Sequence, residues 1–100
     1  MATTSKALAR TAAATSSTTL YTVPSSTTTI VTNIVVTNSA ATAATFTITL
    51  DSVDLFKTCA IAANSTATFD LKQVLATTKI IAGFASATTV AFHISGVEIA

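Results

Sequence analysis

The sequence predicts an all-β fold, namely an antiparallel β-sandwich of about seven or eight short strands behind an extended N-terminal segment. Two observations support this prediction. Apolar and small polar residues alternate, most clearly over Thr45–Asp51, which is the period of a strand with one buried face. Turn signals separate such segments at intervals of roughly ten residues, with almost no helical period. Jelly-roll and immunoglobulin-like topologies both remain open.

The N-terminal segment differs in composition from the rest of the chain. Residues 2–17 are almost all Ala, Thr and Ser, and Leu8 is the only larger aliphatic residue among them. Such a segment cannot bury enough apolar surface to fold alone. We therefore expect residues 1–17 to form an extended arm that becomes ordered on a neighbouring molecule, and residues 18–100 to form the sandwich domain.

The first half of the domain contains four predicted strands. Residues 19–23 form a strand that Pro24 ends, because proline lacks a backbone N–H. A long β-branched run follows over residues 27–38. The alternating segment 44–51 is the third strand, and a short fourth one over 53–57 follows the bend at Asp51 and Ser52.

The second half contains three more strands. Residues 66–71 alternate again, and residues 73–76 are expected to form a turn or a single 3₁₀ turn. A strand over 79–84 is expected to contain a bulge at Gly83. In the last strand, 88–99, His93 should face outwards, while a bulge near Gly96 should turn Val97 and Ile99 towards the core.

Large side chains indicate where the core lies. Phe46, Phe69, Phe84 and Phe92 each align with inward aliphatic residues, so we expect them in the core. Cys59 cannot form an intrachain disulfide because it is the only cysteine, and we expect it to be a small buried hydrophobic residue.

Composition argues against several classes of function. Charged residues make up 9% of the chain, against about 25% in typical soluble domains. The net charge is +1 and the basic residues are scattered, so we expect no nucleic-acid partner. The chain contains no run of about 18 apolar residues, so no membrane-spanning segment is predicted. Its first ten residues also lack the apolar core of a secretion signal.

No catalytic, cofactor-binding or metal-binding site is predicted. His93 is the only histidine, and no G-x-S-x-G nucleophile motif occurs. Asp51, Asp54 and Asp70 could gather around calcium, but the sequence lacks a dense Asp/Asn/Gly loop, so we expect solvated carboxylates with lysine partners. Asn64-Ser65-Thr66 matches a glycosylation acceptor, but without a secretion signal it predicts a turn.

Several segments, in their order and spacing, resemble a group of small β-sandwich virion proteins of tailed bacteriophages. The similarity covers about residues 19–99 and excludes the arm. Each motif alone is only a turn or strand pattern, and Ser26, Ser52 and Ser65 stand where sandwich turns often carry glycine. The segments are Tyr21–Pro24, Thr27–Asn38, Ile61–Thr66, Asp70–Leu75 and His93–Ile99.

The resemblance implies a non-enzymatic structural protein of the virion, assembled in the bacterial cytoplasm. The leading expectation is a capsid cement or decoration protein that forms a trimer or another homo-oligomer and contacts the major capsid protein or other virion proteins. A neck, tail, baseplate or fibre subunit is the alternative within this class. A receptor- or carbohydrate-binding module is the alternative from a different class.

Surfaces of small polar residues suit such contacts. Outward positions carry Thr, Ser and Ala and few charges, which permits close approach, and the hydroxyls bond without the cost of burying a charge. Aromatic residues are enriched at subunit interfaces. We expect interface residues at Leu8, Arg10, Tyr21, Phe56 and His93.

Overall fold

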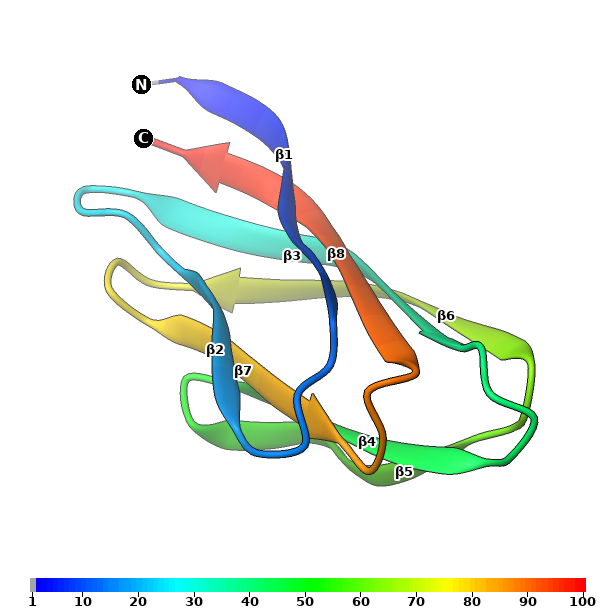
Figure 1. Ribbon diagram of the computed structural model, residues 1–100. Coiled ribbons are helices and arrows are strands. Elements are labelled where there is room, and N and C mark those ends of the chain that lie inside the picture. The colour runs from blue at the N-terminus through cyan, green and yellow to red at the C-terminus, as the bar shows by residue number, and fades with distance from the viewer. Residues whose placement is uncertain (1) are drawn as a thin grey trace.

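The computed structural model describes residues 2–100 and confirms an all-β protein of eight antiparallel strands in two sheets (Figure 1). Within these residues there is no helix, and so none with the length and apolar character to cross a membrane. The strands are β1 (Thr3–Ala12), β2 (Thr18–Thr22), β3 (Thr28–Asn38), β4 (Ala44–Leu50), β5 (Val53–Ile61), β6 (Ser65–Leu75), β7 (Ile80–Ala85) and β8 (Val90–Ile99).

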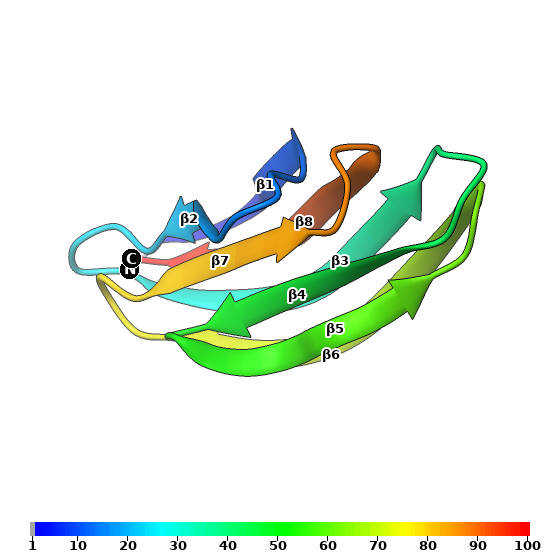
Figure 2. The same ribbon diagram turned by 60° about the horizontal axis from the view of Figure 1, so that its bottom comes forward.

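The strands pair in a nested order. β1 pairs with β8, β2 with β7, β3 with β6 and β4 with β5, as in one long antiparallel hairpin. This hairpin is rolled so that β3 also pairs with β8, and β4 with β7. The result is sheet A, in the order β1-β8-β3-β6, and sheet B, in the order β2-β7-β4-β5. Figure 2 shows the two sheets as separate layers.

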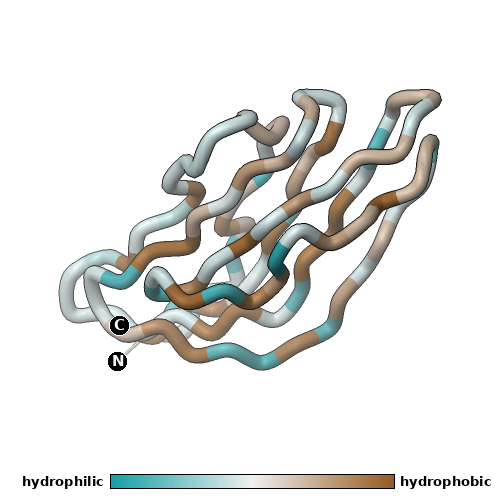
Figure 3. Tube along the Cα trace, turned by 90° about the horizontal axis from the view of Figure 1, so that it is seen from below, coloured by the Kyte–Doolittle hydropathy of each residue, from teal (hydrophilic) through white to brown (hydrophobic). Residues whose placement is uncertain are grey.

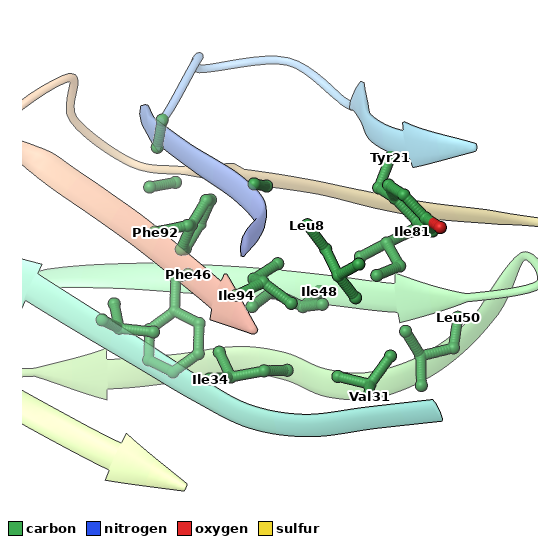
Figure 4. Packing of buried hydrophobic residues seen from close by; sticks show 14 of the residues in the cluster. Leu8, Tyr21, Val31, Ile34, Phe46, Ile48, Leu50, Ile81, Phe92 and Ile94 are labelled. Atoms are coloured by element: carbon green, nitrogen blue, oxygen red, sulfur yellow. The ribbon is translucent and has the colours of Figure 1, made fainter. Parts of the chain in front are cut away.

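The core lies between the two sheets and is thin. The molecule measures 46 × 21 × 17 Å, which leaves room for one layer of side chains from each sheet. Hydropathy alternates along the strands as the sequence predicted (Figure 3). Figure 4 shows the inward side chains of both sheets in contact. The largest fully buried ones are Phe46, Phe92, Ile34, Ile48, Ile81 and Ile94.

The N-terminal arm expected for residues 1–17 is not confirmed, because residues 3–12 form β1 at the edge of sheet A. Leu8 is 7% exposed and belongs to the core cluster. The backbone of Ala2 exchanges two hydrogen bonds with that of Ala100, at 2.9 and 2.8 Å, so the two ends lie side by side (Figure 1). The segment is stable here because β8 supplies the pairing that it cannot provide for itself.

Two strands are longer than predicted. The turn expected over residues 73–76 is wrong for Gln73–Leu75, which continue β6 by pairing with Thr29–Val31. β5 extends to Ile61 instead of ending at Lys57, because its later residues pair with β4. In both cases cross-strand pairing outweighs a local sequence that alternates poorly.

Two predictions of side-chain direction are wrong. Phe84 pairs with Thr47, which faces outwards between the inward residues Phe46 and Ile48, so Phe84 lies on the outer face of sheet B. The alternation of β8 continues through Gly96 without a shift in β8 itself. It therefore turns Glu98 inwards, opposite the fully buried Thr29, and leaves Val97 facing outwards.

The only two glycines of the chain occupy equivalent places in the two sheets. A Cβ atom built at Gly96 of β8 would overlap the carbonyl oxygen of Ile30 in β3 and lie 2.9 Å from Leu8 Cδ1 in β1. One built at Gly83 of β7 would lie 3.0 Å from the carbonyl oxygen of Thr47 in β4 and 3.2 Å from Leu20 Cδ1 in β2.

The bulges sit beside these glycines. Leu8 and Leu20 are the extra residues in β1 and β2, at the points where the register with β8 and β7 shifts. Gly83 itself stays in register with both neighbours, so the bulge expected there lies on the partner strand. A leucine thus bulges over a glycine in each sheet, and the missing Cβ leaves it room.

Serine, aspartate and asparagine take the place of glycine in the turns. Asp51 and Ser52 have φ values of 54° and 64° and form the two-residue connection between β4 and β5, as in a type I′ hairpin turn. Ser26 has φ of 55° and Asn64 of 51°. In the turn expected at Asn64-Ser65-Thr66, the residue with the left-handed backbone is therefore Asn64 and not Ser65.

We predict that Leu8→Ala lowers the free energy of unfolding by about 2–3 kcal/mol, because it leaves a cavity beneath β1. Ala7→Ser, at the neighbouring exposed position, is the control and should be nearly neutral. Urea unfolding of both variants measures the difference. Equal stabilities would mean that residues 3–12 do not pack on the core.

We also predict that Gly96→Ala destabilises the protein by about 3 kcal/mol or more, and Gly83→Ala by about 1 kcal/mol. The added methyl group at Gly96 meets backbone that cannot move aside, whereas the contacts at Gly83 are longer. Thermal unfolding of the two variants gives the comparison. A more stable Gly96→Ala than Gly83→Ala protein would contradict the close approach of β3 to β8.

Candidate interaction surfaces

The residues expected at an interface occupy three different environments. Leu8 and Tyr21 are buried, at 7% and 9% exposure, and face the core of this chain. Arg10 and His93 are direct cross-strand neighbours on β1 and β8, on the outer face of sheet A. Phe56 is half-buried on β5. The structure therefore brings Arg10 and His93 together and separates them from the other three.

Tyr21 belongs to a polar cluster between the sheets that the sequence analysis missed. Its hydroxyl lies 2.9 Å from Thr29 Oγ1 and donates a short hydrogen bond to the Glu98 carboxylate. Lys6 Nζ approaches the same Glu98 oxygen at 3.4 Å. The cluster joins β2 of sheet B to β1, β3 and β8 of sheet A. The sequence signal that could have revealed this cluster is the alternation of β8, which places Glu98 among the inward residues.

These contacts shift two pKa values in opposite directions. The hydrogen bond from Tyr21 lowers the pKa of Glu98, and Lys6 adds to this, against the opposing effect of burial. Burial raises the pKa of Tyr21 above 10.0, and the Glu98 carboxylate raises it further. The cluster thus favours an ionised Glu98 and a protonated Tyr21. It acts as a structural connection between the two sheets, since each of its groups has a partner within the chain.

Asn38 forms a second buried polar centre, at the opposite end of the sandwich from Glu98. Its Nδ2 donates to the carbonyl oxygens of Thr42 and Ala62, at 2.8 and 3.3 Å. Its Oδ1 accepts from the Ala40 N–H and the Thr89 hydroxyl, at 3.1 and 3.2 Å. Because these bonds use both ends of the amide, Asn38 holds three loops together and has no free group for a ligand.

The outer face of sheet A carries mostly uncharged residues, many of them small. Outward positions run across the sheet in rows, because the strands are in register. One row is aliphatic, with Val97, Ile30 and Val74 on adjacent strands, and Val74 is 68% exposed. The next rows are Ala7-Ser95-Asn33-Asp70, Arg10-His93-Val35-Thr68 and Ala12-Ala91-Thr37-Thr66.

The outer face of sheet B has the same character. Thr45, Thr47 and Thr49 point outwards along β4, with Ala82 and Phe84 beside them on β7. Thr47 is 5% exposed, because its hydroxyl accepts the Thr58 N–H at 3.0 Å in the bulge of β5. Thr49 Oγ1 also donates a long hydrogen bond to the Ala82 carbonyl oxygen at 3.5 Å, so threonines on this face contribute to the structure at two of these positions.

The third surface lies where the edge strands β5 and β6 meet, and we call it the β5–β6 seam. All the partly buried hydrophobic residues packed on the core, except Leu20, lie along it. The rings of Phe56 on β5 and Phe69 on β6 pack together at a tilt of 37°, with centroids 4.5 Å apart, and both rings lie next to Phe46. The apolar residues of the seam are Leu55, Phe56, Cys59, Ala67, Phe69 and Leu71.

All four acidic side chains have a partner within the chain. Lys79 Nζ lies 3.7 Å from Asp51, and Lys57 Nζ lies 3.8 Å from Asp54, as expected for solvated carboxylates with lysine partners. Asp70 accepts a hydrogen bond from Asn33 at 3.2 Å. Over residues 2–100, His, Cys, Asp and Glu side chains form no group of three that could hold a metal ion. Cys59 is free and half-buried.

Comparison with known proteins identifies no relative: the chain matches no family model, no curated protein and no solved structure.

The Glu98 cluster predicts a loss of stability in acid. Because the pKa of Glu98 is lower in the folded state, its contribution is present above the ordinary carboxyl range and is lost as the pH falls below about 4.5. The pKa of Tyr21 is raised in the folded state, so the contribution of Tyr21 to the free energy of unfolding is lost as the pH rises above about 10.

We predict that Glu98→Gln lowers the free energy of unfolding at pH 7 by about 1–2 kcal/mol, because the charge-assisted bond is lost. The variant should also lose less stability than the wild type between pH 5 and 3. Asp51→Asn, which breaks an exposed ion pair, is the control and should change stability little. Unfolding measured across this pH range would contradict the prediction if both variants behaved alike.

Proposed function

We propose that this protein is a non-enzymatic structural component of a bacteriophage virion, and that it cements or decorates the head shell. The proposal rests on the resemblance of residues 19–99 to small virion sandwich proteins and on the nature of the outer faces. Those faces are the observation that carries it, because a protein meant to be covered needs surfaces of low charge and regular shape.

The strand order supports this proposal. We infer that the nested pairing, with sheets β1-β8-β3-β6 and β2-β7-β4-β5, is a jelly roll, since this topology contains eight strands in two sheets. Jelly rolls are common in viral capsid and lectin domains. The topology alone fits several functions, so it raises the expectation of a virion role without deciding it.

The chemistry of the outer faces supports attachment by many weak contacts. The rows of sheet A offer hydroxyl, methyl and isopropyl groups at regular spacing, and Arg10 and Asp70 are the charges in its central rows. Burying such a face carries little desolvation cost. Identical contacts repeated over a symmetric shell then add up, because each bound copy restrains its neighbours.

The segment expected to act as an arm contributes differently in this proposal. Residues 3–12 belong to sheet A, so Arg10 and Ala12 extend its outer face by one strand. Attachment would then depend on that face, with Arg10 on its edge strand β1 and His93 beside it on β8, and less on a flexible extension. Self-association would use the remaining surfaces.

A purified phage that encodes this chain provides the test. We expect quantitative mass spectrometry of the particles to find a copy number comparable to that of the major shell protein. Particles lacking the chain should lose DNA at a lower temperature, and adding the purified protein back should restore their resistance. Arg10→Asp should weaken this rescue, whereas Lys79→Asp, at an exposed turn, should not.

Other outcomes separate the alternatives. A copy number matching a single ring or fibre would replace the shell role by a neck, tail, baseplate or fibre role. Absence from purified particles would reject the virion proposal altogether.

A further inference from the structure

The β5–β6 seam has the composition of a protein interface. Its centre is apolar and half-buried, with the Phe56–Phe69 pair and Leu71 at the opening between the two sheets. The two large hydrophobic side chains with the greatest exposure among residues 2–100, Val53 at 67% and Val74 at 68%, lie on the same two strands. An apolar centre with exposed apolar neighbours marks a surface that another molecule covers.

The charges along the seam are balanced on each strand. β5 carries Asp54 and Lys57, and β6 carries Asp70 and Lys72, all of them exposed. A strand with one acid and one base close together is complementary to an antiparallel copy of itself. If two β6 strands lie antiparallel about a two-fold axis at Leu71, Asp70 of each faces Lys72 of the other. This complementarity selects a second copy of the chain as the partner.

The edge geometry determines the kind of contact. All four edge strands, β1, β2, β5 and β6, contain register shifts, and that of β6 leaves Leu71 and Lys72 opposite the single residue Thr32. Bulges of this kind interrupt continuous backbone pairing between edges. The contact therefore depends on side chains. The bulge also forms an open hollow of about 380 Å³ lined by Thr32, Asp70, Leu71 and Lys72, next to the inferred axis.

We propose that two copies of this protein associate through the β5–β6 seam, across a two-fold axis at Leu71. Leu71 and Phe69 of both copies form the apolar centre, and two Asp70–Lys72 ion pairs flank it. The proposed function includes self-association, and the present proposal identifies the β5–β6 seam as the surface that mediates it. It depends only on the chain itself, so the virion role and the dimer can fail separately.

Charge reversal tests the proposal on the full-length protein. We expect Asp70→Lys alone and Lys72→Asp alone each to weaken dimerisation by at least about tenfold, because each change creates two like-charge contacts. Mixing the two single variants should restore the dimer, since the heterodimer then has one ion pair of the original polarity and one of reversed polarity. The double variant carrying both changes should dimerise with itself. Sedimentation equilibrium over a range of concentrations measures all four samples.

Controls identify the surface. Arg10→Asp makes a matched charge reversal on β1, at the opposite edge of sheet A from β6, and should leave the dimer unchanged. Far-UV circular dichroism and thermal unfolding establish that each variant is folded. Because Leu71 lies on the inferred axis, Leu71→Cys in a Cys59→Ser background should form a disulfide-linked dimer under mild oxidation, which tests the geometry without changing any charge.

The remaining outcomes overturn the proposal. These are a wild-type protein that stays monomeric at millimolar concentration, a trimer, a dimer insensitive to the charge reversals, and mixed variants that fail to reassociate. A monomer found in purified particles would remove the seam dimer and keep the virion role. A protein that forms the seam dimer but is absent from purified particles would keep the dimer and reject the virion role.

Discussion

The close approach of one neighbouring backbone and one leucine side chain to a glycine is the constraint on which both sheets depend. At Gly96 the strands β1, β8 and β3 meet, and at Gly83 the strands β2, β7 and β4 meet in the same arrangement. In each place a bulged leucine from the edge strand fills the volume that a Cβ atom would occupy. Each of the edge strands β1 and β2 thus packs closely against its sheet at one point, where its leucine contacts the glycine. Neither glycine has a left-handed backbone, and serine, aspartate, asparagine and threonine take the left-handed positions instead.

Alternation along the chain predicted the fold class and most strands, because inward and outward residues differ clearly in β3, β4 and β8. It failed where the side chains were small. β1 has only Leu8 as a large inward residue, so its composition resembles that of a disordered segment, although pairing with β8 stabilises it. Phe84 was assigned to the core by its size, whereas the inward positions beside it belong to Gly83 and Ala85. In a strand with small inward residues, size does not indicate direction.

The interaction surfaces were predictable in character but not in location. Composition alone indicated neutral faces of threonine and alanine, and the structure arranges them in rows on both sheets. Of the individual residues, Arg10 and His93 lie on such a face, whereas Leu8 and Tyr21 are in the core, since an aromatic or aliphatic residue suits either environment equally. The Glu98 cluster and the β5–β6 seam depend on contacts between residues far apart in sequence, which no local pattern records.

The mutual hydrogen bonds of Ala2 and Ala100 make the polypeptide almost a closed ring. β1 pairs with β8 along its length, as the strands of the three inner pairs do with each other. A short linker between the two ends would turn the outermost pair into a hairpin like β4 and β5. Any surface turn could hold the ends of a rearranged chain, provided that Leu8 and Gly96 remain opposed.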